Sequence, residues 1–164
     1  MNENANEPVC VPDQCTGRRI GWEDYWMKIT QDIALRSTCI RRNIGCVIVK
    51  DNIIVSTGYN GAPRGFPHCI ERGCIRDELG IQSGTRHEIC FGVHAEQNAL
   101  LQAGRDSEGG TLYVNAYPCK ICAKMILNAL IKQVVISGTY SDIEGIELLK
   151  DGGVDVKILK NESK

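Results

Sequence analysis

The chain has 164 residues, of which 19 are basic and 20 acidic, so its formal net charge is −1 at pH 7. That length suits one domain rather than two, and the charge balance supplies no field that would attract a polyanion such as RNA. No apolar run reaches the roughly eighteen residues of a membrane span, and residues 1–14 lack the pattern of a signal peptide. We therefore expect a cytoplasmic protein whose partners include neither nucleic acid nor membrane.

The first third of the chain predicts a tail, a helix and a hairpin. Residues 1–20 are polar and contain proline, which indicates an N-terminal tail or arm before a single domain at 21–164. Apolar residues recur at helical spacing over 22–39. Two β-branched runs, 44–49 and 53–59, are joined by a turn-prone linker and predict a β-hairpin.

Residues 61–92 are rich in glycine and proline and show no clear period. Such a stretch is too long for an ordinary loop in a compact domain. We interpret it as a long irregular insertion that something must hold in place.

The remainder of the chain alternates between helical and strand-like patterns. Helix-forming or amphipathic segments occupy 94–103, 119–131 and 142–149, and strand-like segments occupy 111–114, 134–136 and 154–159. Strands that alternate with helices favour a layered α/β fold.

Two short motifs carry the chemistry, His94-Ala95-Glu96 and Pro118-Cys119-Lys120-Ile121-Cys122. One imidazole and two thiolates supply three of the four ligands of a tetrahedral zinc ion, and an open fourth position is typical of a catalytic site. Glu96 lies two residues beyond His94 and is placed to move protons to and from a water molecule. Each motif falls at the start of a predicted helix, where the partial positive charge favours thiolates.

Two simpler interpretations compete with a metal site. Cys119 and Cys122 could form a redox pair, although such a pair usually stands without a distant His-x-Glu. His94 could be a core histidine and Glu96 a first-turn carboxylate that complements the helix dipole. Without a metal, His-x-Glu and Pro-Cys-x-x-Cys would both have to occur in one chain by coincidence. The zinc interpretation is therefore favoured.

These motifs, with Gly58-Tyr59-Asn60-Gly61-Ala62-Pro63 before them, make residues 22–159 resemble the deoxycytidylate deaminases of the cytidine deaminase-like superfamily. The resemblance implies a three-layer α/β/α fold with a central mixed sheet of about five strands. One departure is Cys46, where alanine is common, and we interpret it as a small core residue.

The resemblance also implies a reaction, the zinc-dependent hydrolysis of dCMP to dUMP and ammonia in the supply of dTMP precursors. Glu96 would take a proton from the water that zinc activates and deliver it to the cytosine ring and the departing ammonia. Asn60 would hydrogen-bond the sugar, and the backbone N–H of Ala95 would fix the pyrimidine edge. Asn60 could instead be only a turn residue before Gly61.

Binding partners follow from the same resemblance. The phosphate of a nucleotide needs cationic donors, and the candidates are Arg36, Arg41, Arg42 and Arg64, although any single arginine is more often a solvated surface charge. Relatives are often controlled by dCTP and dTTP and form homo-oligomers, so a homo-oligomer is expected and both nucleotides are candidate effectors.

Nine cysteines call for an explanation in a reducing compartment, where metal ligands are more common than disulfides. Five candidate ligands lie in or beside the insertion, and a second, structural zinc would use four of them: Cys39, Cys69, Cys74, His87 and Cys90. Such a site matches a zinc-rich branch of the family, and buried free thiols are the alternative. Cys10 and Cys15 have no nearby partner and are expected to be free thiols.

Two other functions stay open at this point. An adenosine deaminase acting on tRNA, or another nucleobase or nucleoside deaminase, would share both metal motifs. A noncatalytic module in which zinc holds a protein-binding surface would need the metal ligands but not Glu96.

Overall fold

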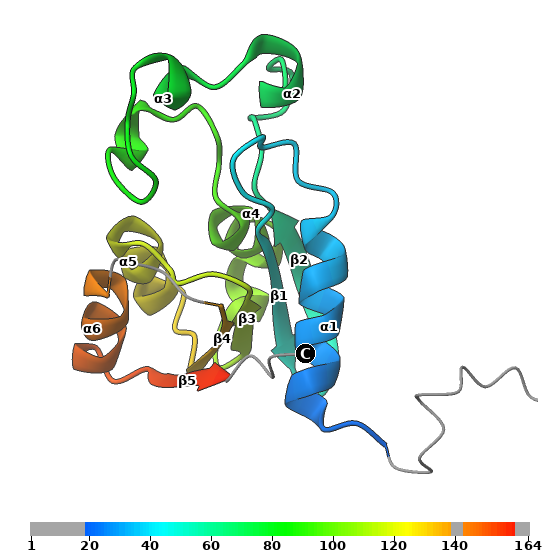
Figure 1. Ribbon diagram of the computed structural model, residues 1–164. Helices are drawn as coiled ribbons and strands as arrows, with labels where there is room; N and C mark the ends of the chain where they lie inside the picture. The colour runs from blue at the N-terminus through cyan, green and yellow to red at the C-terminus, as the bar shows by residue number, and fades with distance from the viewer. Residues whose placement is uncertain (1–18, 139–142, 160–164) are drawn as a thin grey trace, which may run out of the picture.

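The centre of the protein is a five-stranded mixed sheet, which the computed structural model shows within the described residues, 19–138 and 143–159. The strand order is β2-β1-β3-β4-β5 (Figure 1). β1 runs antiparallel to both β2 and β3, whereas β3, β4 and β5 are parallel. The strands are β1 Gly45–Lys50, β2 Ile53–Tyr59, β3 Thr111–Val114, β4 Gln133–Ser137 and β5 Asp155–Leu159.

Helices cover both faces of this sheet (Figure 1). α1 lies on one face, and α4, α5 and α6 lie on the other, so the expected three-layer α/β/α architecture is confirmed. No helix of the described residues is long and apolar enough to cross a membrane. The helices are α1 Trp22–Ala34, α2 Cys69–Arg72, α3 Ile75–Glu78, α4 Ala95–Ala103, α5 Lys120–Asn128 and α6 Glu144–Asp151, with 3-10 turns η1 His87–Ile89 and η2 Gly104–Ser107.

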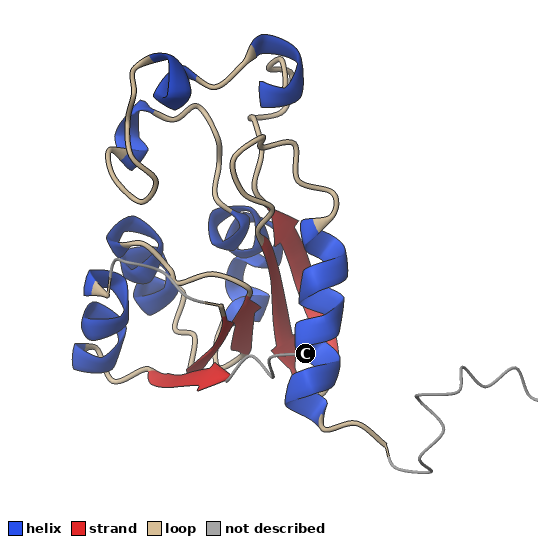
Figure 2. Cartoon of the chain, in the orientation of Figure 1, coloured by secondary structure: helices blue, strands red, loops and turns tan. Residues whose placement is uncertain are grey.

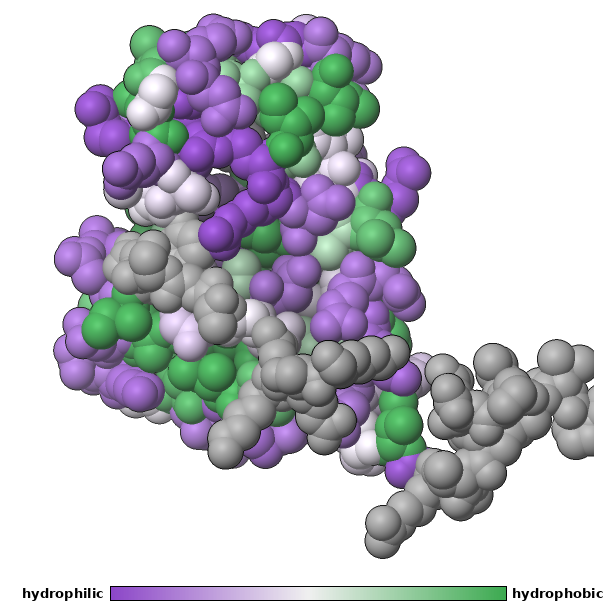
Figure 3. All heavy atoms as spheres, in the orientation of Figure 1, coloured by the Kyte–Doolittle hydropathy of each residue, from purple (hydrophilic) through white to green (hydrophobic). Residues whose placement is uncertain are grey.

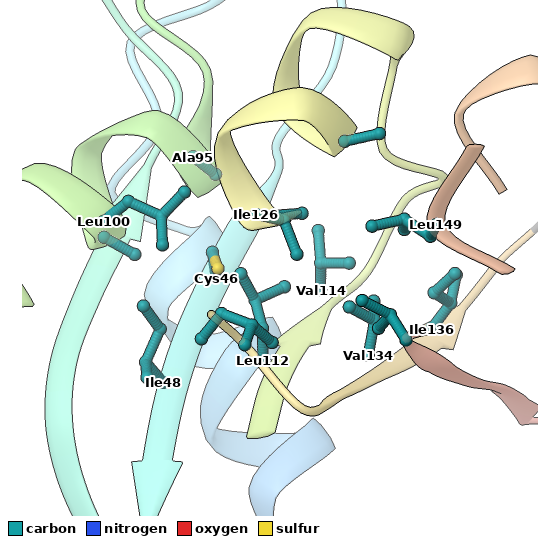
Figure 4. Packing of buried hydrophobic residues seen from close by; sticks show 14 of the residues in the cluster. Cys46, Ile48, Ala95, Leu100, Leu112, Val114, Ile126, Val134, Ile136 and Leu149 are labelled. Atoms are coloured by element: carbon teal, nitrogen blue, oxygen red, sulfur yellow. The ribbon is translucent and has the colours of Figure 1, made fainter. Parts of the chain in front are cut away.

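Alternation along the strands divides the apolar core into two parts. On β1, Cys46 and Ile48 point toward α4 and α5, whereas Val47 and Val49 point toward α1. Figure 4 shows the larger part, in which Cys46 and Ile48 pack with residues of β3, β4 and the helices. Cys46 is fully buried there, as expected of a small core residue. A period of two therefore places one row of each central strand in each core.

α4 lies unusually close to β2 because position 58 is a glycine. A Cβ atom on Gly58 would stand 2.2 Å from the carbonyl oxygen of Ala95 and 2.5 Å from the nitrogen of Ala99. The helix also bonds to the strand through two side-chain amides. Asn98 Nδ2 donates to the carbonyl of Tyr59 at 2.8 Å, and Gln102 Nε2 donates to that of Thr57 at 2.9 Å.

The predicted elements agree with the structure apart from some of their ends. The hairpin at 44–59 and the strand at 111–114 are confirmed. The first helix ends at Ala34 rather than near residue 39, because the chain turns at 35–38 and Thr38 N–H then bonds to the carbonyl of Asn60. The predicted helix 119–131 ends at Asn128, since Leu130 adopts a φ of 56°. Cys10, Cys15 and nearly all of the expected tail lie outside the described residues.

The insertion at 61–92 rises beyond the end of the sheet and consists of loops and single helical turns (Figure 2). Its two ends are fastened together, because Gly61 and Val93 exchange backbone hydrogen bonds of 3.1 and 2.8 Å. Arg41 holds its middle through the carbonyl of Ile81 at 3.0 Å and the carboxylate of Asp77 at 3.4 Å. Ordinary polar contacts thus support a stretch that lacks regular secondary structure of its own.

Candidate active site

His94, Cys119 and Cys122 converge between the amino ends of α4 and α5. His94 is the N-cap residue of α4, Cys119 is the N-cap residue of α5, and Cys122 lies in the first turn of α5. The Nδ1 atom of His94 is 3.5 Å from Cys119 Sγ and 3.3 Å from Cys122 Sγ, and all three atoms lie within 4.8 Å of one another. The two motifs therefore meet at the helix starts, as their positions in the sequence predict.

These distances fit a zinc ion. Zn–N and Zn–S bonds of about 2.0 and 2.3 Å at tetrahedral angles would separate nitrogen from sulfur by roughly 3.5 Å. Within the described part of the chain, this is the one group of three or more His, Cys, Asp or Glu residues with such closely spaced ligand atoms. Three ligands leave one tetrahedral position for water or substrate.

The hydrogen bond between Cys119 and Cys122 shifts the pKa values of both thiols. A hydrogen bond from Cys122, with a further one from His94, lowers the pKa of Cys119 to about 3. The same bond to Cys119, together with burial, raises the pKa of Cys122. The pair thus holds one thiolate at neutral pH, and a divalent cation favours loss of the second proton.

Glu96 lies beside this group and is almost inaccessible, with 3% of its surface exposed. Burial raises the pKa of its carboxyl above the usual range, and the Cys122 side chain hydrogen-bonds to it. A raised carboxyl pKa suits a group that must both accept and return a proton near neutral pH.

A cavity opens over these residues, between the sheet and the insertion. Figure 3 shows a hollow at this level of the molecule, bordered by hydrophilic residues. Residues of the metal group form one part of its lining and residues of the insertion form another. The lining includes His94, Glu96, Cys119, Asn60, Tyr117, Ser83, Gly84 and His87.

Asn60 and Ala95, the predicted substrate contacts, both lie at this site. Asn60 lines the cavity, but its Oδ1 already accepts the Ile44 N–H and its Nδ2 already donates to the carbonyl of Arg42, both at 2.9 Å. It therefore shapes the loop, although it does not adopt the positive φ of a left-handed turn residue, and its bond to a sugar stays a prediction. Ala95 is fully buried at the first position of α4, where a helix leaves the N–H free of the i−4 ladder.

The structure separates the four predicted phosphate contacts. Arg41 and Arg42 line the cavity, whereas Arg36 and Arg64 do not. Arg64 lines a second cavity, together with Tyr59 and Phe66. A buried arginine that the sequence analysis missed, Arg76 of α3, lines the first cavity instead. Its place in an aperiodic insertion gave no signal that it would be buried.

The five candidate ligands of a second metal site are four cysteines that lie near one another and one histidine that packs against His94. Burial and the charges of Cys39, Cys90 and Cys74 raise the pKa of Cys69, which places four thiols in one neighbourhood. No three of them bring their sulfurs within 4.8 Å of one another among the described residues. His87 lines the same cavity as these thiols, and its ring packs 5.1 Å from that of His94 at an angle of 77°.

Comparisons with known proteins agree with this geometry. Residues 20–138 match the family model described as the cytidine and deoxycytidylate deaminase zinc-binding region. The deoxycytidylate deaminase of Saccharomyces cerevisiae is 42% identical over 142 residues, 85% of this chain and 45% of the relative. That of Mycobacterium phage D29 is 40% identical over 123 residues, 71% of this chain and 94% of the relative.

Solved structures support the same relationship. The dCMP deaminase of the cyanophage S-TIM5, in complex with dCMP and dUMP, superposes with a TM-score of 0.71 at 31% identity, covering 86% of this chain and all of that one. The chain spans less than half the length of the two yeast relatives, from Saccharomyces cerevisiae and Schizosaccharomyces pombe. The matched region contains His94, Cys119 and Cys122, which make one zinc site, and the chain belongs to the cytidine and deoxycytidylate deaminase family.

Proposed function

We propose that this protein catalyses the hydrolytic deamination of dCMP to dUMP and ammonia, in the supply of dTMP precursors. The observation that carries the proposal is the buried carboxyl of Glu96 beside the closely spaced ligand atoms of His94, Cys119 and Cys122. The deoxycytidylate deaminases among its relatives support dCMP as the substrate.

Each residue at the site has a task in this reaction. His94, Cys119 and Cys122 would hold the zinc ion, which supplies Lewis acidity that makes water a nucleophile at neutral pH. Glu96 would carry two protons in turn. The first passes from the attacking water to the ring nitrogen beside C4, and the second passes from the new C4 hydroxyl to the amine, which leaves as ammonia when the C4–N bond breaks. The free N–H of Ala95 orients the base, and Asn60 borders the sugar.

A small nucleotide fits this site better than a polynucleotide does. Residues of the insertion, among them Ser83, Gly84 and His87, line the cavity together with Glu96. A tRNA loop would have to pass the insertion to reach Glu96. The net charge of −1 on the protein would not attract the RNA. A solved tRNA:A34 deaminase that shares the fold is only 19% identical, with a TM-score of 0.54.

The direct test is ammonia release by the zinc-loaded protein from dCMP, CMP, deoxycytidine and a tRNA hairpin. We expect dCMP to have the highest kcat/KM. Turnover of the hairpin alone would contradict the proposal, and absence of any turnover would favour a noncatalytic zinc module.

We also propose a second, structural zinc on Cys39, Cys69, Cys74 and Cys90. The Arg41 N–H donates to Cys39 Sγ at 3.5 Å, and the Gly92 N–H donates to Cys90 Sγ at 3.3 Å. Backbone donors aimed at sulfur stabilise thiolates. His87 is then the surplus residue of the five candidates, because it packs against His94.

Metal counting tests this second site. The wild-type protein should carry two zinc ions per chain, and Cys69→Ser should carry one while keeping a fully occupied catalytic site. A wild-type content of one would reject the site.

Two further features are proposed on the family relationship alone: assembly into a homo-oligomer and control by dCTP and dTTP. Light scattering of the purified protein measures the first. The second is tested by dCMP saturation curves recorded with each nucleotide, where unchanged curves would count against control. A single domain at 21–164 and a cytoplasmic location belong to the same proposal.

A further inference from the structure

Arg76 is a buried cation that the proposed reaction does not yet use. It is 7% exposed, and it is the one lysine or arginine among the described residues that is less than a tenth exposed. Burying a charge is costly unless it is paired. No carboxylate of the described residues forms a salt bridge with it, so its counter-charge has to come from elsewhere.

The hydrogen bonds of Arg76 leave part of its guanidinium without a partner. Its Nη2 donates to the carbonyls of Gln82 at 2.9 Å and Thr85 at 2.6 Å, while its Nε is buried with no partner. An unsatisfied buried donor on a charged group is expensive. The two carbonyl bonds fix the plane of the guanidinium, so the free donor is held in a set direction.

Arg41 also carries an unpartnered donor, although its Nε pairs with Asp77 at 3.4 Å. The Nη2 of Arg41 donates to the carbonyl of Ile81, next to the Gln82 carbonyl that Arg76 bonds. The Nη1 of Arg41 is buried without a partner. Both arginines line the cavity over the metal group, with Ser83 and Gly84 in the same lining. One turn of the insertion thus brings two incompletely satisfied guanidinium groups to one site.

The same cavity contains the single buried carboxylate of the described residues, Glu96. Glu96 and Arg76 do not form a salt bridge, so neither charge is the partner of the other. A ligand that fills this cavity can therefore present a reacting group to Glu96 and an anionic group to the arginines.

We propose that Arg76, assisted by Arg41, binds the 5′-phosphate of the substrate and makes the enzyme select a nucleotide over a nucleoside. Guanidinium forks match phosphate oxygens in geometry and charge. This assignment rests on the proposed dCMP deaminase function and deepens it, because it places the phosphate determinant in the insertion.

The competing role for Arg76 is to neutralise the four thiols near Cys69. Arg72 is the other arginine of this region, but it stacks over Phe91 at 4.3 Å and does not line the cavity. Arg76 lines one cavity with both Glu96 and the four thiols, so the zinc content of the Arg76→Gln variant separates the two roles.

The experiment compares ligands that differ only in the phosphate. Calorimetry measures the binding of dUMP and deoxyuridine to zinc-loaded wild type, Arg76→Gln and Arg76→Lys, and kinetics compares dCMP with deoxycytidine. For Arg76→Gln we expect dUMP binding and the kcat/KM for dCMP to fall about 100-fold, mainly through KM. Values for deoxyuridine and deoxycytidine should stay within about threefold, at unchanged zinc content.

The matched control is Arg72→Gln, which removes an arginine from the same insertion. Arg72 stacks over Phe91 at 4.3 Å and does not line the cavity. The Arg72→Gln variant should therefore keep the wild-type preference for dUMP over deoxyuridine. An equal effect of Arg72→Gln, an equal loss for both members of each ligand pair, or a loss of zinc from Arg76→Gln would overturn the assignment.

The conservative variant decides the case if Arg76→Gln does not fold. Arg76→Lys keeps the charge but loses the fork, so dUMP should bind about tenfold more weakly while deoxyuridine is unaffected. Unchanged dUMP binding in this variant would reject the proposal. Failure of the proposed function gives a different result: no ammonia from dCMP with any variant, including wild type.

Discussion

Glu96 combines burial with a close approach to the thiol pair of the zinc site. Its raised carboxyl pKa follows from burial, and its neighbours include Cys122, which hydrogen-bonds to it. A carboxylate on the surface could not hold a proton for delivery to a leaving amine near neutral pH. The burial of Glu96 and its place beside the zinc ligands are what the proposed role of proton carrier requires.

Replacing Glu96 by glutamine should remove catalysis and leave the protein intact. The amide is isosteric but cannot carry the proton, so kcat should fall by about 100- to 10,000-fold. Zinc content, measured by elemental analysis, should stay at the wild-type value, because Glu96 is not one of the three ligands.

Glu88→Gln is the matched control for this change. Glu88 pairs with Arg86 at 2.6 Å on the exposed side of the insertion. Its kcat should equal that of wild type. A Glu96→Gln enzyme with normal kcat would eliminate Glu96 as the proton carrier.

α4 and β2 act as one unit because the glycine at position 58 lets their backbones touch. The helix carries His94 at its N-cap and Glu96 in its first turn. Any displacement of α4 from the sheet therefore moves His94 and Glu96 together, while Cys119 and Cys122 stay in place with α5.

A methyl group at position 58 should separate these two elements. In Gly58→Ala the new Cβ would stand 2.2 Å from the Ala95 carbonyl oxygen. We expect a loss of about 1–3 kcal/mol of stability, which lowers the Tm by roughly 3–10 °C. Thermal unfolding followed by circular dichroism measures this shift, and zinc affinity should fall as well.

Gly21→Ala provides the comparison. A Cβ at Gly21 would meet only Asp24 Oδ2 at 3.4 Å, and its φ of −61° suits any residue. Its Tm should stay within about 2 °C of wild type. Equal Tm values for the two variants would show that the contact between α4 and β2 is not tight.

Over the whole molecule, the insertion and the α/β body share one cavity. Backbone hydrogen bonds between Gly61 and Val93 join the two ends of the insertion, and Arg41 from outside it holds its middle at Ile81. Substrate enclosure therefore depends on order in a segment that has little regular structure.

Removal of zinc should loosen the insertion before the body unfolds. After treatment with a chelator, limited proteolysis should cut first within 61–92, and mass spectrometry of the fragments would locate the cuts. Far-UV circular dichroism should keep most of its amplitude, because the helices packed on the sheet lie outside the insertion. First cuts within the body instead would show that the metals hold the sheet and its helices.

The sequence predicted what depends on local pattern. The run at 111–114 became β3 with the same bounds, and the spacing of His94, Cys119 and Cys122 placed the metal group at two helix starts. Arg76 and the packing of His87 on His94 depend on how an aperiodic segment folds back over the body. No periodicity or motif encodes such a contact, so it could be found only in three dimensions.

The amides of Asn98 and Gln102 have an effect beyond holding α4 in place. β2 is the outermost strand on its side of the sheet, and the Tyr59 and Thr57 carbonyls already accept hydrogen bonds from these side chains. An exposed border strand with unsatisfied carbonyls is a template for pairing with another chain and for fibril growth. Asn98 and Gln102 of α4 thus also protect the protein against strand pairing with another copy along β2.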